Sequence, residues 1–573
     1  MVLITIFNRR YLAANKRFSR WKSSKSKIIK QSFCLALLSC SWLTSVLVLP
    51  ATSAERISFT YGAFGEFYIS IDDLETFART GKITSSFAYY ADRFSPQDLV
   101  KLRDLLNRSF DVSVVTTSIF LNLPIGKQLT KEIGSIIDSP LKVSQPALRA
   151  SLILAAAEPD GLTILNVLRL YSTKTLRLNS RQIFKAVDEA TKLLTQTERV
   201  FQALEQEAKS QIEIVNSARL KALKDLSQPE KHQWRKEYIS IDLKRGKAAP
   251  RKIEGVVYLP LSKDRPVPLV AIAPGLNTDW HNFTYIAKHL ASHGFGVAAL
   301  NFPSTNAKRI NAVLNGLDTP PSDNEWVEQP KVVTQLLDEI ERKSKNDPAW
   351  QGKLDLQRVG IIGQSLGGYT AMAIAGAKVD WQHLRQKCQE SNSLEQIDLN
   401  PSLLWQCQSS YAVAPNTNLQ DKRVVAAIAI NPVTTPIFSN SGINKLESPL
   451  MIVTGEKDRF APALDEQIKP FTELLGIEKY LILIEDSTHF SFIGAGSSQD
   501  IELSPEIIGF DPAIARSYLK TLSVAFFQTH LAQQNQFRFY LTESYLKTIS
   551  KQPLSINLLR FLTKERLEEL IED

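Results

Sequence analysis

The second half of the chain alternates short apolar runs with longer segments whose apolar residues recur about every three or four positions. The short runs are typical of buried strands, and the longer spacing is typical of helices. The predicted strands are Val256–Leu259, Val267–Ala273, Gly296–Asn301, Val359–Gly363, Val424–Ile430, Leu450–Thr454 and Tyr480–Ile484. The predicted helices between them are His281–His293, Asn324–Lys343, Gly367–Lys378 and Ala463–Leu475. Near-continuous apolar strands separated by helices predict a mostly parallel sheet with helices on both faces.

The first part of the chain has a mostly helical pattern over residues 55 to about 178, without Cys, His or a Gly-rich loop. Asn179 then opens a long helix whose apolar stripe runs from Ile183 to Ala208. The stripe is irregular at Thr197, so we expect it to pack against a neighbouring domain. A dimerising coiled coil is the alternative.

A chain of 573 residues is too long for one hydrophobic core, so several domains are expected. The predicted parts are a signal peptide (1–54), an all-helical domain (55–178), a long linker helix (179–234), an α/β domain (235–532) with an insertion (380–422), and a helical tail (533–573).

The net charge of +9 comes from the N-terminus. Residues 1–54 contain nine of the 68 basic residues and no acidic one, which leaves 59 basic against 59 acidic residues in the rest. A folded part without net charge gives no reason to expect a nucleic acid partner.

The basic segment is followed by an apolar run, Phe33–Leu49, and then by the small residues of Pro50–Ala54. This order predicts a secretory signal cleaved after Ala54, and therefore export to a periplasm, a thylakoid lumen or the medium. An uncleaved membrane anchor is the alternative, although the run is at the short limit for a span.

Cleavage would remove Cys34 and Cys40 and leave Cys388 and Cys407. In an oxidising compartment this pair is expected to form one disulfide, with two buried thiols as the alternative. Two cysteines without further nearby ligands do not make a zinc site.

His289 and His293 have the spacing of a zinc-binding pair, but no glutamate lies between them and no third ligand is evident. We interpret them as ordinary helix residues and expect neither a metal nor an organic cofactor.

The chemistry of the chain centres on Gly363-Gln-Ser365-Leu-Gly367, between a predicted strand and a predicted helix. A serine at such a sharp turn presents its hydroxyl above the sheet edge, and glycines allow the turn without steric clash. The N-terminus of the helix would stabilise an oxyanion beside the hydroxyl. Ser365 is therefore the predicted nucleophile.

A serine needs a base, and the expected chain order is serine, acid, histidine. Only His383, His489 and His530 follow Ser365. His489 comes in a short loop after the last predicted strand, where it can reach the serine. His383 belongs to the insertion, and His530 lies late in a C-terminal helix, so neither is expected to act.

The acid is expected at a strand exit as well. Asp458 follows Leu450–Thr454 within the loop Gly455–Asp458 and would orient the His489 ring. Asp486 competes by sequence proximity, but it lies too near the end of its strand.

Two backbone amides are expected to form the oxyanion hole. One belongs to Leu366, directly after the nucleophile, and the other to Leu276, in the loop after Val267–Ala273. Asn277 is expected to reinforce that loop.

These residues resemble those of α/β-hydrolases. Pro274–Asn277, Leu290–Phe295 and Gly363–Gly368 are similar to the esterase branch that contains platelet-activating-factor acetylhydrolases and dienelactone-hydrolase-like proteins. The whole mature chain also resembles cyanobacterial exported hydrolases with an N-terminal helical domain of unknown function (DUF1400). The matching segments are Ala54–Ile57, Leu74–Ala78 and Ala155–Thr163.

The resemblance implies the α/β-hydrolase fold and a triad of Ser365, Asp458 and His489. The His-Gly usual in the family's oxyanion loop is Pro274-Gly275 here, which preserves the backbone donor and changes its side-chain support.

The sequence therefore predicts an exported serine hydrolase that cleaves acyl esters, of lipid or acetyl-glycerophospholipid type by the resemblance. The insertion is expected to form a lid. A hydrolase fold kept for binding is one alternative, and a peptidase or thioesterase with the same triad is another. Peripheral membrane contact and the oligomeric state are left open.

Overall fold

The computed structural model describes residues 53–60, 65–110, 112–212, 223–243, 251–261, 265–391, 400–411, 418–496 and 505–572. Residues 1–52, with most of the predicted signal peptide and its two cysteines, lie outside this range. Within the described ranges, no helix is long and apolar enough to cross a bilayer.

The chain divides into two compact units. The C-terminal unit contains Ser118–Glu132 and the residues from Ile183 onward. The N-terminal unit contains the described residues up to Thr117 together with Ile133–Gln182.

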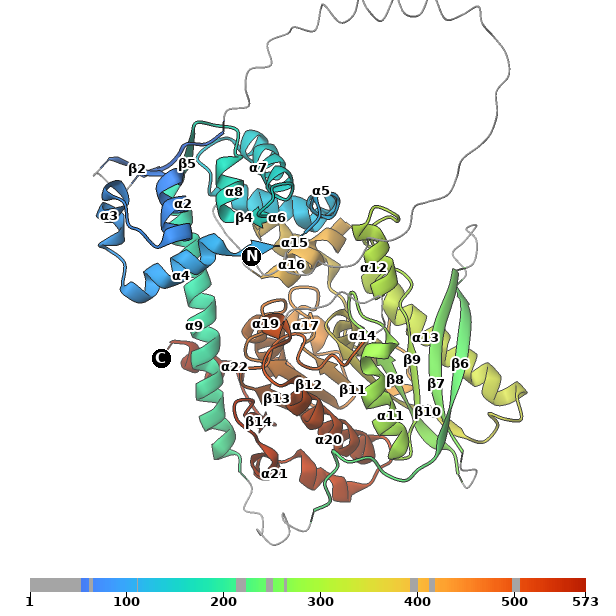
Figure 1. The fold of residues 1–573 in the computed structure, drawn as a ribbon. Coiled ribbons are helices and arrows are strands. Elements are labelled where there is room, and N and C mark those ends of the chain that lie inside the picture. The colour runs from blue at the N-terminus through green and yellow to red at the C-terminus, as the bar shows by residue number, and fades with distance from the viewer. Residues whose placement is uncertain are drawn as a thin grey trace, which may run out of the picture. The chain divides into compact units, whose positions relative to one another are not determined.

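The C-terminal unit is built around one large sheet, which has nine strands in the described part of the chain (Figure 1). Their order is β14-β13-β12-β11-β10-β8-β9-β7-β6, and β13 through β9 run parallel, with antiparallel strands at both edges. The bounds are β6 (Trp234–Leu243), β7 (Arg251–Pro260), β8 (Val267–Ala273), β9 (Gly296–Leu300), β10 (Leu354–Gln364), β11 (Val424–Ile430), β12 (Leu450–Gly455), β13 (Lys479–Ile484) and β14 (Ile556–Leu559).

Helices cover both faces of this sheet, which confirms the predicted fold class (Figure 1). α13 (Glu325–Asn346) and α14 (Leu366–Ala375) pack on one face. α11 (Thr284–Ser292) and α20 (Pro512–His530) pack on the other. The predicted linker helix 179–234 is wrong in its C-terminal part, because α9 spans Ser180–Ser210 and residues 223–233 form no helix. α9 contributes buried apolar residues to the core on the α13 side.

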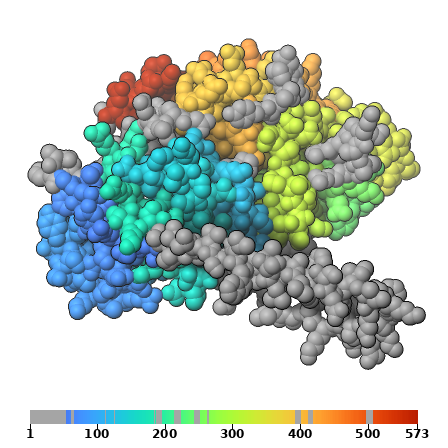
Figure 2. Space-filling view, turned by 90° about the horizontal axis from the view of Figure 1, so that it is seen from above, coloured from blue at the N-terminus to red at the C-terminus, as the bar shows by residue number. Residues whose placement is uncertain are grey.

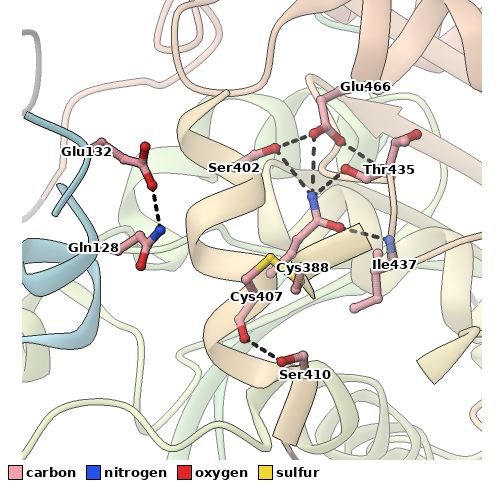
Figure 3. The surroundings of a disulfide bond; sticks show 10 residues. Gln128, Glu132, Cys388, Ser402, Cys407, Ser410, Thr435, Ile437 and Glu466 are labelled. Carbon is pink, nitrogen blue, oxygen red and sulfur yellow. Dashed lines mark hydrogen bonds between the residues drawn. A yellow bond between two sulfur atoms is a disulfide. The ribbon is translucent and has the colours of Figure 1, made fainter. Parts of the chain in front are cut away.

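The insertion lies between α14 and β11, at the surface of the C-terminal unit (Figure 2). Its described elements are α15 (Trp381–Ser391), α16 (Pro401–Gln408) and η4 (Ser409–Tyr411). The predicted disulfide is present: Cys388 of α15 and Cys407 of α16 are bonded, with their Cα atoms 5.4 Å apart (Figure 3).

The C-terminal segment 533–573 was predicted as a helical tail, and that prediction is wrong in part. It contains η6 (Asn535–Leu541), α21 (Glu543–Ile549) and α22 (Lys564–Glu572), but also the edge strand β14. β14 pairs antiparallel with β13 through its short apolar run.

The N-terminal unit is largely helical, as predicted, but the all-helical description is wrong. Its strands β1 (Arg56–Thr60), β2 (Glu66–Ser70) and β5 (Thr175–Leu178) pair in the order β2-β1-β5, and β3 (Ser109–Phe110) pairs with β4 (Leu162–Thr163). β1 and β2 are rich in aromatic and β-branched residues, which favour strands. The helices assigned wholly or partly to this unit are α2 (Ile71–Thr80), α3 (Ser85–Ala91), α4 (Pro96–Asn107), α5 (Val114–Asn122), α6 (Pro124–Ser135), α7 (Leu141–Ala155), α8 (Ile164–Arg169) and the start of α9.

Candidate active site

The predicted nucleophile occupies a strained turn between β10 and α14. Ser365 has φ 58° and ψ −121°, a left-handed conformation that is rare outside glycine. Its side chain lies at the C-terminal edge of the sheet, and the residue is 8% exposed. Strain of this kind persists where the surrounding structure enforces it, and it often marks a functional site.

The two glycines of the motif are required by contacts on either side of the turn. A Cβ on Gly363 would lie 1.9 Å from the carbonyl oxygen of Gly367, and a Cβ on Gly367 would lie 1.9 Å from that of Ala273. Both distances are far below van der Waals contact, so only glycine allows β8, β10 and α14 to meet this closely.

The two predicted oxyanion donors lie on adjoining segments. A Cβ on Gly275 would lie 3.1 Å from the Ser365 Cβ, so the loop after β8 runs directly against the nucleophile. Leu276 follows Gly275, and Leu366 is the first residue of α14. Among the described residues, neither of these two NH groups donates a hydrogen bond to another protein group, so both are available to a ligand.

The loop after β8 is stabilised by its neighbours. The Asn277 NH donates to the Thr305 carbonyl at 2.7 Å, and the Thr278 hydroxyl donates to the Gly275 carbonyl at 2.9 Å. Asn277 thus supports the loop through its backbone and its left-handed conformation, with φ 60°.

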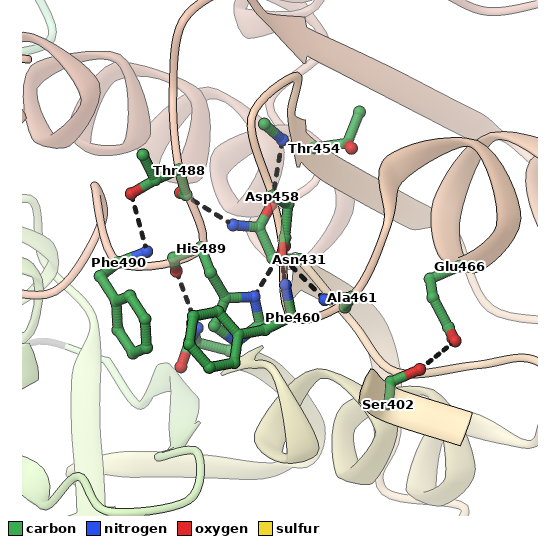
Figure 4. A network of polar contacts seen from close by, with 12 residues as sticks. Ser402, Asn431, Thr454, Asp458, Phe460, Ala461, Glu466, Thr488, His489 and Phe490 are labelled. Carbon is green, nitrogen blue, oxygen red and sulfur yellow. Dashed lines mark hydrogen bonds and ion pairs between the residues drawn. The ribbon is translucent and has the colours of Figure 1, made fainter. Parts of the chain in front are cut away.

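The predicted acid and base are hydrogen-bonded to each other (Figure 4). Nδ1 of His489 lies 2.7 Å from Oδ2 of Asp458, and both side chains are almost fully buried. The other oxygen of Asp458 accepts hydrogen bonds from the NH groups of Phe460 and Ala461, each at 2.8 Å. These bonds fix the carboxylate and direct it at the ring, as in a triad whose acid sets the histidine tautomer.

The competing acid points elsewhere. Asp486 has φ 54°, and its carboxylate pairs with the Lys457 ammonium. The structure therefore brings Asp458, and not Asp486, to His489.

The third contact of a triad is open in this structure. Within the described chain, no hydrogen bond joins the Ser365 hydroxyl to the His489 ring. Catalytic hydrogen bonds are often long before substrate binds and shorten in the reacting complex.

The two histidines with the spacing of a zinc-binding pair have structural partners. Nε2 of His289 lies 2.9 Å from the Leu226 carbonyl, and Nε2 of His293 lies 3.0 Å from the Gln228 carbonyl. Burial lowers the pKa of His289 to about 4. In the parts of the chain that the structure describes, no group of three or more His, Cys, Asp or Glu could hold a metal ion.

His530 packs against aromatic rings of the core, with Nε2 3.3 Å from the Tyr480 hydroxyl, and burial lowers its pKa to about 4. His383 lies in α15, where its NH donates to the Asp380 carboxylate. Neither is part of the site around Ser365.

The sequence did not indicate a buried carboxyl group beneath the insertion. Glu466, in η5 (Leu464–Ile468), is fully buried, and burial raises its pKa to about 7. Its oxygens accept hydrogen bonds from three side chains of the insertion and from two backbone NH groups after β11. Figure 3 shows Glu466 with Ser402 and Thr435. The donors are Asn400, Ser402 and Gln406, and then the NH groups of Thr434 and Thr435.

The disulfide joins the two helices of the insertion, and the Glu466 network fixes α16 to the body of the unit. A cavity of about 560 Å³ lies beside it, lined by residues that include Leu403 of α16, Phe438, Lys469 and Leu567 of α22. Ser365 and His489 are not among its lining residues, so this cavity is separate from the candidate active site.

Two family models match the chain. Residues 53–179 match a model described as an alpha/beta hydrolase of unknown function (DUF1400), and residues 252–420 match a model described as PET hydrolase-like. The second match includes Ser365 and its glycines, whereas Asp458 and His489 lie beyond its end. A comparison with curated proteins gave no match.

The fold and both matches show that this chain has the α/β-hydrolase fold. The PET hydrolase-like match further supports an ester-cleaving hydrolase of this fold. The relation to platelet-activating-factor acetylhydrolases stays a prediction.

Proposed function

We propose that this protein is an exported serine hydrolase that cleaves carboxylic esters through an acyl-enzyme. The Ser365 oxygen attacks the acyl carbon, its proton passes to Nε2 of His489, and the NH groups of Leu276 and Leu366 hold the oxyanion. His489 then returns the proton to the leaving alcohol, and water releases the acyl group by the same route.

The observation that carries this proposal is the 2.7 Å contact between Asp458 and His489 beside a strained serine turn. Asp458 would stabilise the imidazolium that forms when Ser365 loses its proton. The left-handed serine and the available amides match the electrostatic needs of an acyl transfer.

The substrate class proposed is a small-molecule or lipid ester. The PET hydrolase-like match supports ester cleavage, and polyester oligomers are a natural addition to a panel of esters. The resemblance to platelet-activating-factor acetylhydrolases adds short acyl esters of glycerophospholipids.

Export is part of the proposal, and the disulfide between Cys388 and Cys407 supports it. Disulfides persist in oxidising compartments and are rare in the cytosol. The N-terminal basic and apolar segments agree with this location.

The test is steady-state hydrolysis of chromogenic esters graded by acyl length, together with thioester and peptide analogues. Ser365→Ala should lose about 10⁴-fold or more in kcat. Ser523→Ala is the matched control, because Ser523 is fully buried in α20 and only bonds its own helix. Equal activity in wild type and Ser365→Ala would refute the proposal, and faster turnover of peptides or thioesters would reassign the substrate.

A further inference from the structure

The loop that carries His489 is held by two buried side-chain amides. Nε2 of Gln364 donates to the His489 carbonyl at 3.1 Å. Nδ2 of Asn431 donates to the Thr488 carbonyl at 3.3 Å, as Figure 4 shows. The two bonds thus hold consecutive peptide carbonyls of the base-bearing loop. We call Gln364 and Asn431 the carboxamide clamp.

Both members of the carboxamide clamp are almost inaccessible to solvent. Gln364 is 1% exposed and Asn431 is 0% exposed. A carbonyl oxygen can only accept, so each side chain must turn its NH₂ group toward the loop. A buried donor that loses its partner is costly, which makes these two bonds strong restraints on the loop.

Gln364 connects the loop to the nucleophile. It is the last residue of β10 and directly precedes Ser365. A Cβ on Gly275 would lie 2.7 Å from its Oε1, so the same side chain also lies against the loop with the first oxyanion donor.

Asn431 connects the loop to the acid. It follows β11 with φ 43°, a conformation that asparagine tolerates better than most residues. Its Oδ1 accepts a hydrogen bond from the NH of Gly455 at 3.1 Å, at the end of β12 and shortly before Asp458.

We propose that the carboxamide clamp sets the position of the His489 ring relative to Ser365 and Asp458. The inference rests on the proposed function, because it concerns the step in which the Ser365 proton moves to Nε2 of His489. Gln364 and Asn431 are then positioning residues. A displacement of about 1 Å between reacting groups can lower a rate about 100-fold.

The test replaces Gln364 with methionine, which keeps the length of the side chain and removes the donor. Gln528→Met is the matched control, since Nε2 of Gln528 in α20 also donates to a buried backbone carbonyl, that of His293, at 3.1 Å. Gln364→Met loses the hydrogen bond at the His489 loop. Gln528→Met loses the bond to His293 and also the bond that Gln528 Oε1 accepts from Gln534 at 3.0 Å, and neither lies at the His489 loop.

We expect Gln364→Met to lower both kcat and the rate of phosphonylation by a fluorophosphonate about 10- to 100-fold, with KM within about 3-fold of wild type. Gln528→Met should keep kcat, KM and the phosphonylation rate within about 2-fold of wild type. Equal phosphonylation rates in the two variants would overturn the carboxamide clamp alone. An unreactive, folded wild type would overturn the proposed function, and this inference with it.

If Gln364→Met does not fold, Gln364→Glu provides a second test, because glutamate has the same shape as glutamine. A protonated carboxyl group can donate to the His489 carbonyl, and an ionised one cannot. The ratio of its kcat/KM to that of wild type should therefore fall about tenfold or more as pH rises from about 5 to 9. A ratio that stays constant over this range would contradict the inference.

Discussion

Replacing Glu466 with glutamine should remove a pH-dependent part of the stability. Burial raises the pKa of Glu466 to about 7 from its ordinary 4.5, while its hydrogen bonds act in the opposite direction. The folded protein therefore holds this proton more tightly than the unfolded chain does. The resulting stabilisation is complete below about pH 4.5, declines as pH rises through 7 and is absent above it.

The size of the effect follows from the two pKa values. A change from 4.5 to about 7 corresponds to about 3 kcal/mol of unfolding free energy. The protonated group can donate to the Ser402 hydroxyl, which in turn has an acceptor in Asn400 Oδ1 at 2.8 Å. A glutamine amide carries no titrating proton, so Glu466→Gln removes the pH dependence of this group. Its NH₂ group cannot accept from Asn400 or from the NH groups of Thr434 and Thr435, which lowers the stability of the variant by an amount that does not change with pH.

The assay is urea unfolding followed by tryptophan fluorescence between pH 4.5 and 8. The stability of wild type relative to Glu466→Gln should fall by about 3 kcal/mol over this range. Glu447→Gln is the control, because Glu447 is exposed and lies outside this network, so its replacement should leave the pH profile unchanged. Parallel curves for wild type and Glu466→Gln would refute the reasoning.

Three further predictions concern the site and its support. Asp458→Asn should lower kcat about 10³- to 10⁴-fold in the ester assay, whereas the kcat of Asp486→Asn should stay near that of wild type. Similar losses of kcat in both variants would contradict the assignment of the acid. Cys388→Ser removes a disulfide whose cysteines are 19 positions apart, so the free energy of unfolding in urea should fall by about 3 kcal/mol. An unchanged unfolding midpoint would contradict this prediction. In Gly367→Ala the new Cβ would lie 1.9 Å from the Ala273 carbonyl oxygen, so the turn must shift. Thermal unfolding followed by circular dichroism should show a lower stability, and the ester assay a lower activity. A fully active variant would contradict the tight turn.

The sequence predicted the parts of the site that depend on local pattern. Apolar runs marked the parallel strands, and parallel strands end at one edge of a sheet, so their exit loops had to meet there. This placed Ser365, Asp458 and His489 close together in prediction, and the structure joins Asp458 to His489 at 2.7 Å.

Edge strands were harder to predict. β6 has alternating polar and apolar residues, and β14 is only a short apolar run, so neither resembles a buried central strand. Their pairing is decided by the partner strand and not by their own sequence.

Buried polar groups could not be identified from the sequence. Glu466 lies between a charged residue and a polar one, as many exposed glutamates do, and its burial depends on where α16 packs. The roles of Gln364 and Asn431 depend on which carbonyls approach them in space. The one local signal was a carboxamide side chain at the end of an apolar strand run.

The central claim is that Ser365 is an activated nucleophile, and labelling with a fluorophosphonate tests it most directly. Intact-mass analysis of the purified protein should show one adduct, which peptide mapping places on Ser365. Ser365→Ala should show no adduct, and Ser523→Ala should react as wild type does. A folded wild type that stays unlabelled, or an adduct that persists in Ser365→Ala, would contradict the account.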